Sequence, residues 1–243
     1  MVLVGGGPGD PGLLTVAGLE AIRSADVIVS DRLAPLAALR HARAQAEIVD
    51  VGKIPRGEFT PQERINAQLI EYARQGRRVV RLKGGDNFVF GRGGEEWQAC
   101  AAAGIAVDVI PGVSSAVAAP ALAGIPLTHR RLTQGFTVVS GHLAPGDPGS
   151  TLDWAALART NTTLVIMMGV ATLGAITDEL LGHGLDPATP AATVADAGMP
   201  SQRTVRAAVS HIARVTADAG IKAPAITVIG AVAGFEPGRT EPT

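Results

Sequence analysis

Hydrophobic and polar positions follow two periods along this chain, one typical of strands and one typical of helices. Short runs of valine, isoleucine and leucine predict buried strands in the first half, at residues 2–4, 27–29, 47–51, 78–82 and 107–110. Apolar residues at helical spacing predict helices between them, at residues 14–24, 36–46, 60–73, 95–103 and 114–123. Thr15 is available to cap the first helix, and Glu63 stands at a capping-box offset in the third.

The second half repeats this alternation with a different spacing. Its predicted strands are residues 136–140, 163–167, 192–195 and 225–229, and its predicted helices are residues 154–159, 173–183 and 204–216. Residues 126–135 have no clear period, so we expect an N-terminal α/β domain at 1–132 and a C-terminal α/β domain at 133–243. Strands that alternate with helices favour parallel or mixed sheets flanked by helices in both domains.

Composition places the chain among folded globular proteins. Of the 243 residues, 47% are hydrophobic and 18% are charged, and the net charge of −1 gives no indication of a nucleic-acid or membrane partner. The single cysteine, Cys100, excludes an internal disulfide and a multi-cysteine metal site. The N-terminus lacks the pattern of a signal peptide, and residues 113–125 are too short to span a membrane, so we expect a cytoplasmic protein.

Unusual loops follow several of the predicted strands. They comprise residues 5–12, 30–32, 84–94 and 111–115 in the first half, with 168–169 and 197–198 in the second. Ligands of α/β sheets bind beyond the carboxyl ends of the strands, so this arrangement favours a cofactor in a cleft between the two domains. Residues 83–96 (KGGDNFVFGRGGEE) contain two Gly-Gly pairs, which indicate a backbone shaped around a ligand; the alternative is a glycine-rich turn whose charges are solvated.

The residues of the first loop, 5–12, restrict the kind of cofactor that can bind there. Gly5 and Gly7 partly match the dinucleotide pattern G-x-G-x-x-G, but Asp10 occupies the third glycine position. Pro8 and Pro11 lack the N–H groups that would cradle a pyrophosphate, and no phosphate-binding P-loop occurs. Nucleotide phosphates are therefore disfavoured, whereas a cofactor without phosphates, such as S-adenosylmethionine, passes the test.

Several motifs together resemble one known family, the tetrapyrrole methylases. The similarity extends from residue 2 to about residue 232, in the order VGGGPGDPGLLT at 4–15, DRL at 31–33, GK at 52–53, GIPLTHR at 124–130, GH at 141–142 and MG at 168–169. Within this family, residues 81–96 (RLKGGDNFVFGRGGEE) resemble most the uroporphyrinogen-III C-methyltransferases.

The resemblance implies a two-domain tetrapyrrole methylase fold, a homodimer and S-adenosylmethionine in the interdomain cleft, with S-adenosylhomocysteine as product. It implies two methyl transfers to carbons of uroporphyrinogen III, giving precorrin-2 for siroheme or cobalamin. The positions that match cofactor contacts are Pro8, Gly84, Gly85, Asp86, Val89, Ser114, Ser115, Met168 and Ala197. Those that match catalytic groups are Asp31, Lys53 and Arg92, and those that match substrate-binding groups are Glu95 and Arg130. Arg32 joins the substrate-binding set because its guanidinium suits the substrate's carboxylates.

The chemistry is consistent with these residue types. Arginine forks suit the carboxylates of uroporphyrinogen, and a carboxylate such as Asp31 is able to accept the proton that leaves the methylated macrocycle. His129 and His142 have no clustered carboxylate or cysteine, so we expect no metal. Two positions depart from the family pattern: Asn87 replaces a proline, which restores a backbone N–H, and Ala197 replaces a glycine.

Two other classes of function stay open. One is a related methyltransferase that acts on a later corrin precursor or on a protein side chain, and it would not require Arg92, Glu95 and Arg130. The other is a cofactor-binding module in which the changes at positions 87 and 197 have abolished turnover. No dehydrogenase–ferrochelatase segment precedes Met1, so we expect methylation alone.

Overall fold

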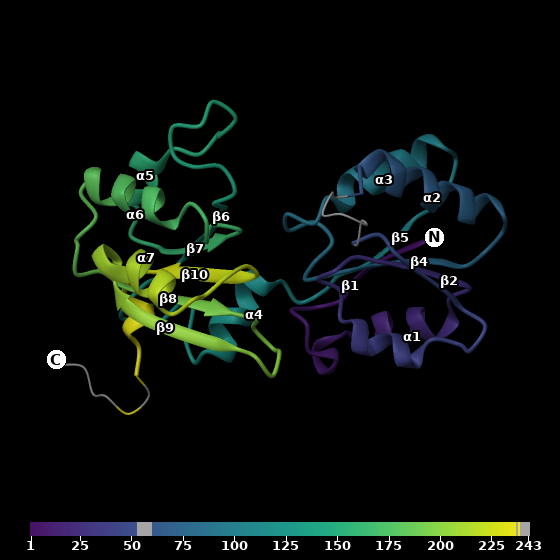
Figure 1. The fold of residues 1–243 in the computed structure, drawn as a ribbon, viewed down its shortest axis with the longest axis horizontal. Coiled ribbons are helices and arrows are strands. Elements are labelled where there is room, and N and C mark those ends of the chain that lie inside the picture. The colour runs from purple at the N-terminus through teal and green to yellow at the C-terminus, as the bar shows by residue number, and fades with distance from the viewer. Residues whose placement is uncertain (53–59, 237, 239–243) are drawn as a thin grey trace. The chain divides into compact units, whose positions relative to one another are not determined.

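The computed structural model describes residues 1–52, 60–236 and 238, and the chain forms two compact units, Met1–Ser115 and Ala116–Thr243. Each unit has its own five-stranded sheet (Figure 1). The predicted domain boundary, after residue 132, lies inside the second unit. Helix α4 (Ser115–Leu122) explains the difference, because Ala116 and Ala119 pack in one core cluster with Val165 and Met167 of the second sheet.

The sheet of the first unit is entirely parallel. Its strands are β1 (Val2–Gly5), β2 (Val27–Ser30), β3 (Glu47–Asp50), β4 (Val79–Lys83) and β5 (Asp108–Ile110), in the order β3-β2-β4-β1-β5. All carboxyl ends therefore share one edge of the sheet. Strands β1, β2 and β4 are almost wholly buried, as expected for strands that are covered on both faces, whereas β3 at the edge of the sheet is largely exposed.

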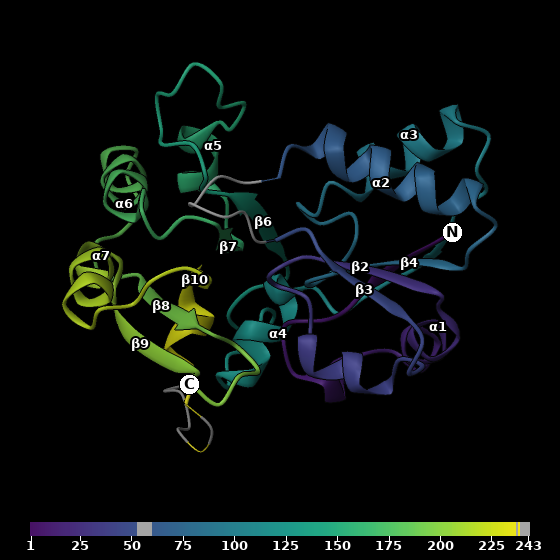
Figure 2. The same ribbon diagram turned by 45° about the vertical axis from the view of Figure 1, so that its right-hand side comes forward.

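Helices cover both faces of this sheet. Figure 2 shows α1 (Val16–Ser24) on one face and α2 (Gln62–Arg74) and α3 (Gly93–Ala102) on the other. Alternate residues of β4 serve the two sides: Val80 and Leu82 pack with Ile22 of α1, and Val79 packs with Leu69 of α2. The short 3₁₀ helices η1 (Pro11–Leu13) and η2 (Leu36–His41) complete the unit.

The second unit has a mixed sheet. Its strands are β6 (Phe136–Ser140), β7 (Thr163–Met167), β8 (Pro190–Ala195), β9 (Arg203–Ala208) and β10 (Ala225–Ile229), in the order β6-β7-β10-β8-β9. Only the β6–β7 pair is parallel among the described strand pairs of this sheet. The helices α5 (Trp154–Arg159), α6 (Leu173–Gly182) and α7 (Val209–Asp218) contribute to one core cluster, and α4 contributes to another; the 3₁₀ helix η3 (Ala231–Gly234) follows β10.

Most predicted elements are confirmed to within a few residues, and strands 136–140, 163–167 and 225–229 are confirmed in full. Thr15 does cap α1, accepting from the N–H of Gly18 at 3.1 Å. The predicted helix 204–216 is wrong at its start, because residues 203–208 form β9 along the antiparallel edge of β8. The predicted helix 36–46 is shortened to η2, and α2 begins after Pro61 with no capping side chain.

Candidate functional site

The loops after β1 and β4 are joined at the carboxyl-end edge of the first sheet. Gly7 and Gly85 exchange two backbone hydrogen bonds, with N···O distances of 3.1 and 2.7 Å. The N–H of Gly6 donates to the carbonyl of Lys83 at 2.8 Å. Two loops that are some eighty positions apart in the sequence therefore form one continuous rim.

Glycine is required where this rim meets the loop after β5. A Cβ added to Gly112 would lie 2.3 Å from the carbonyl oxygen of Gly85 and 2.5 Å from the carbonyl carbon of Gly5. A Cβ added to Gly5 would lie 2.4 Å from the amide nitrogen of Gly112. The three loops thus pack backbone against backbone, at separations that no other residue allows.

We predict that Gly112→Ala lowers the free energy of unfolding by about 1–3 kcal/mol, because the new methyl group pushes the β5 loop away from Gly85. Urea unfolding followed by circular dichroism measures the change. Gly94→Ala is the matched control: a Cβ there meets nothing within 4 Å, and alanine is the better helix former in the first turn of α3. Equal stability of Gly112→Ala and the wild type would contradict this packing role.

The pair Gly84-Gly85 separates into two different requirements. A Cβ on Gly84 would lie 2.4 Å from the carbonyl oxygen of Leu33, so Gly84 is a glycine because the loop after β2 packs on it. Gly85 has φ +65, and a Cβ there would meet only the amide nitrogen of Ser115, at 3.8 Å. Of the two glycines that we predicted to approach a cofactor, only Gly85 has open space beside its Cα.

Asp86 fastens two of the loops together. Its Oδ1 accepts from the N–H of Phe88 at 2.9 Å, and its Oδ2 accepts from the N–H of Gly112 at 3.1 Å. Both carboxylate oxygens therefore have a backbone partner. This gives Asp86 a structural role in shaping the rim, beside the cofactor contact that the resemblance implies.

Asn87 is fully buried and ties the same loop to β5. Its Nδ2 donates to the carbonyl of Ile110 at 2.8 Å, and its own carbonyl accepts from the N–H of Gly93 at 3.0 Å. Its Oδ1 is buried without a partner among the described residues. A proline at this position would have no side-chain N–H to donate to Ile110.

We predict that Asn87→Ala costs about 1–3 kcal/mol of unfolding free energy, because the partly buried carbonyl of Ile110 loses its donor. The urea midpoint at unchanged slope is the measurement. Gln98→Ala, on the exposed side of α3, serves as the control and leaves the midpoint in place. A midpoint for Asn87→Ala equal to that of the wild type would remove the side chain from the loop's architecture.

An exposed apolar surface follows this loop. Phe88 is 50% exposed, Val89 37% and Phe90 45%, and the ring of Phe88 stacks on Trp97 of α3 with centroids 6.0 Å apart and planes inclined by 16°. Exposed apolar side chains that lie together are typical of surfaces that bind a ligand or a partner. Residues 88–90 therefore present an apolar surface that is open to solvent.

Arg92 and Glu95 form an ion pair beside this apolar surface. The guanidinium Nε and Nη2 donate to the two carboxylate oxygens at 2.9 and 2.7 Å, and both side chains are more than half exposed. The hydrogen bonds lower the pKa of Glu95 and raise the pKa of Arg92. Arg92 is the N-cap residue of α3 and has the left-handed conformation, with φ 57.

Asp31, at the end of β2, is held by three donors. Its Oδ1 accepts from the N–H groups of Leu33 and Gly84 at 3.1 and 3.3 Å, and its Oδ2 lies 3.4 Å from Nη2 of Arg81. The side chain is 28% exposed, so solvent reaches it. Arg32, the next residue, is exposed.

A buried ionic cluster of Arg81, Lys83 and Glu96 lies beneath the rim, and the sequence analysis predicted none of these residues as part of the site. Glu96 of α3 is 0% exposed and accepts from Nε of Arg81 at 3.0 Å, from Nζ of Lys83 at 3.0 Å to each oxygen, and from Nε2 of Gln62 at 3.2 Å. Burial, together with the charge of Arg81, lowers the pKa of Lys83. The signal was present in the sequence: positions 81 and 83 of an otherwise apolar strand are basic and share one face.

Four other predicted residues of the first unit have differing outcomes. Pro8 is partly exposed in the loop after β1, and Ser114 and Ser115 are partly exposed at the start of α4. Lys53 lies outside the described residues. The structure thus brings the loops after β1, β2, β4 and β5 to one edge.

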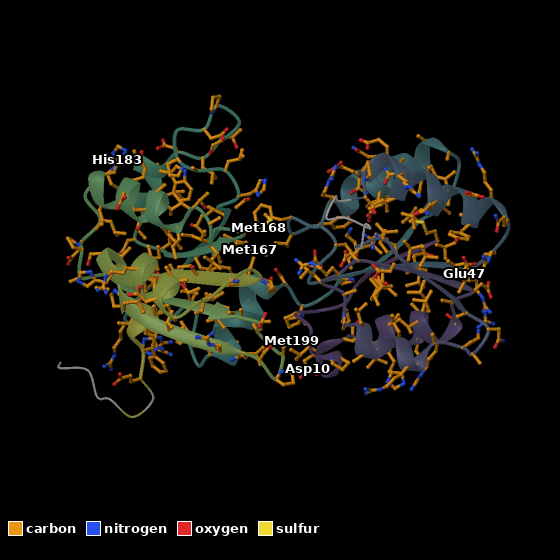
Figure 3. The ribbon with its side chains drawn as sticks, in the orientation of Figure 1. Asp10, Glu47, Met167, Met168, His183 and Met199 are labelled. Carbon is orange, nitrogen blue, oxygen red and sulfur yellow. The ribbon has the colours of Figure 1, made fainter. Side chains whose placement is uncertain are left out.

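Two of the predicted residues of the second unit, Met168 and Ala197, lie near strand ends of its own sheet. Met168, labelled in Figure 3, directly follows β7. It is 46% exposed and has φ 58. Ala197, two residues after β8, is buried in the core cluster with Val165 and Val194, so its methyl group packs in the core. Arg130 is exposed in a turn.

A cavity of about 310 Å³ opens at the opposite edge of the second sheet from Met168. It lies where β7 and β8 begin and β10 ends, and threonines 133, 160, 162, 163 and 189 are among its lining residues. None of the predicted site residues lines it.

Among the residues that the structure describes, no three His, Cys, Asp or Glu side chains gather as metal ligands. Within the same ranges, no helix combines the length and hydropathy that a membrane span needs.

Comparison with known proteins gives consistent matches over most of the chain. A family model described as Tetrapyrrole (Corrin/Porphyrin) Methylases matches residues 1–213. A protein of Methanosarcina barkeri named S-adenosyl-L-methionine-dependent uroporphyrinogen III methyltransferase is 46% identical over 230 residues, which cover 95% of this chain and 90% of that protein. The siroheme synthase of Neisseria meningitidis serogroup B is 47% identical over 233 residues, 96% of this chain.

The chain spans about half the length of the siroheme synthases that it matches, 47% of the Neisseria protein. Among solved structures, the uroporphyrin-III C-methyl transferase of Thermus thermophilus complexed with S-adenyl homocysteine has a TM-score of 0.79 and 39% identity. The match covers 95% of this chain and 92% of that one.

Proposed function

This chain belongs to the family of tetrapyrrole (corrin/porphyrin) methylases, and from that premise we propose that it methylates carbon atoms of uroporphyrinogen III with S-adenosylmethionine as methyl donor. Two successive transfers would give precorrin-2, a precursor of siroheme and cobalamin. A homodimer in the cytoplasm is part of the same proposal, and sedimentation of the purified chain tests the dimer.

One observation supports the proposal above all. Along a single loop and helix start, residues 85–92 place an open glycine, three exposed apolar side chains and an arginine in succession. The substrate has a large apolar macrocycle whose side chains all end in carboxylates. Apolar surface beside an exposed guanidinium matches that combination of properties.

We assign the cofactor to this edge, at Gly85. Open space beside its Cα lets a ligand approach the backbone there, and the partly exposed Ser114 and Ser115 follow the β5 loop that packs on it. When bound, S-adenosylmethionine supplies a methyl group that is already activated on its sulfonium sulfur. The protein's task is therefore to align the pyrrole carbon behind that methyl group and to exclude water.

Asp31 is the group that we assign to proton removal after methyl transfer. Its Oδ1 is held by two backbone N–H groups, whereas Oδ2 has the longer contact of 3.4 Å with Nη2 of Arg81, so we assign the proton to Oδ2. The exposure of the side chain allows the proton to pass on to solvent. Lys53 is assigned to proton transfer by the resemblance alone.

The arginines would bind the substrate's carboxylates. Arg92 is paired with Glu95, so a substrate carboxylate would replace Glu95 on the fork; exposed ion pairs contribute little to stability, and this exchange is therefore easy. Arg32 and Arg130 are exposed and are assigned the same role.

An anaerobic assay of the purified chain with uroporphyrinogen III and S-adenosylmethionine tests the function. We expect a methylated product with the absorbance of a precorrin, with calorimetry measuring cofactor affinity separately. Cofactor binding without turnover on this substrate would favour the module or a related methyltransferase. Binding of neither compound would refute the proposal.

A further inference from the structure

The layer between the first sheet and helices α2 and α3 changes character along its length. Toward the amino ends of the strands it is apolar, with Val27, Val79 and Leu69 in one buried cluster. Toward the carboxyl ends it holds the ionic cluster of Arg81, Lys83 and Glu96. Burying charges is costly, so a charged layer directly beneath the candidate site calls for a functional explanation.

Arg81 is the member of this cluster that reaches the site. Its Nε donates to Glu96, its Nη1 lies 3.3 Å from the carbonyl of Val29 and 3.2 Å from that of Leu82, and its Nη2 faces Oδ2 of Asp31. The side chain is only 3% exposed. The planar guanidinium is therefore fixed along its whole length, and the Nη2 side of its fork is directed at Asp31.

The orientation of the Asp31 carboxylate depends on Arg81. Oδ1 accepts from the N–H groups of Leu33 and Gly84, so the remaining contact, between Oδ2 and Nη2 of Arg81, sets the rotation of the carboxylate plane. Glu96 already has Lys83 and Gln62 as further donors. Glu96 would therefore keep two charge or hydrogen-bond partners without Arg81. Arg81, in contrast, is the donor that the structure gives to Oδ2 of Asp31.

We infer that Arg81 is a positioning residue, which transmits the rigidity of the Glu96 cluster to the Asp31 carboxylate. The inference rests on the proposed function, in which Asp31 takes the proton at Oδ2. A carboxylate anchored at both oxygens keeps one orientation, and orientation errors of about 1 Å reduce rates by as much as ~10²-fold.

The test is a double-mutant cycle on kcat. Arg81→Lys keeps a buried cation for Glu96 but has no fork for Asp31; we expect kcat to fall about tenfold while KM for both substrates is unchanged. Asp31→Asn is expected to reduce kcat about 10²-fold. In the Asp31→Asn background, Arg81→Lys should then cost less than about twofold, because its effect acts through Asp31. An equal cost in both backgrounds would overturn the inference.

A matched control lies at the other end of β4. Arg77 also pairs with a carboxylate, that of Glu47, at the edge away from the site, so Arg77→Lys should leave kcat unchanged. Crystal structures of the Arg81→Lys variant and the wild type supply a readout that needs no turnover. We expect Asp31 to change rotamer or to become disordered in the variant, and an unmoved, well-ordered Asp31 would overturn the inference even if uroporphyrinogen III proved not to be the substrate.

Discussion

Replacing Glu96 by leucine is expected to lower the free energy of unfolding of the first unit by about 3–5 kcal/mol, because this is the cost of removing one partner of a buried ion pair. Glu96 is fully buried and accepts hydrogen bonds from Arg81, Lys83 and Gln62. Without it, two cations stay in a layer closed off from water. Only one of them, Lys83, is able to release its charge there, because arginine does not deprotonate in proteins.

The measurement is urea unfolding followed by fluorescence of Trp97 in a Trp154→Phe background, since these are the two tryptophans of the chain and they lie in different units. Glu95→Leu, one position earlier on the exposed side of α3, is the control and should change stability little. A triple variant, Arg81→Met with Lys83→Met and Glu96→Leu, should recover most of the loss because it leaves no charge in the buried layer, and Asp31, which loses Arg81, is 28% exposed and keeps its two backbone donors. A Glu96→Leu midpoint equal to that of the wild type would contradict this account.

The loss should also depend on pH. Burial lowers the pKa of Lys83 in the folded protein, so between that pKa and the ordinary lysine value the unfolded chain binds more protons than the folded one. Stability in this window rises with pH. Removing Glu96 lowers the folded pKa further and widens the window, so the destabilisation by Glu96→Leu should be smaller at about pH 10 than at about pH 7.

Arg92→Ala is expected to reduce kcat/KM for uroporphyrinogen III by about 10²-fold or more while cofactor affinity stays within about twofold. Arg92 presents an exposed fork beside the apolar surface at 88–90, whereas the open backbone at Gly85 does not involve it. Anaerobic kinetics and calorimetry measure the two quantities separately.

Two further variants separate the guanidinium from the backbone. Arg92 has φ 57, which glycine adopts without strain, so Arg92→Gly must show the same loss as Arg92→Ala if the side chain is responsible. Arg74→Ala, at the far end of α2, removes an exposed arginine away from the rim and should leave kinetics unchanged. Unchanged turnover in the Arg92 variants would remove this residue from the mechanism.

The predicted elements show where local pattern suffices. The buried strands at 163–167 and 225–229 are predictable because each is a short continuous run of apolar residues, which is a local property of the sequence. Residues 203–208 were not, since their strand depends on pairing with β8, and the same residues continue smoothly into the helical pattern of α7. The helix predicted at 36–46 is likewise shorter in the structure, where only Leu36–His41 forms a 3₁₀ helix.

The candidate site shows the same division. Gly84 and Gly85 are indistinguishable as letters, yet the first is a glycine because Leu33 packs on it and the second has φ +65 beside open space. The ionic cluster under the rim joins a strand residue to a helix residue fifteen positions later, and its link to Asp31 spans fifty positions. Such contacts exist only once the parallel order of the strands brings those ends together.

The sequence by itself determined the α/β alternation, the unusual glycine loops after the strands and the family, because strand periods, glycine clusters and motifs are local properties of the chain. Only the tertiary structure decided which glycine is open, that Asp86 and Asn87 fasten the loops, and that Arg81 faces Asp31. The physical reason is that packing and hydrogen bonding between distant segments depend on strand order and register, which no local pattern encodes.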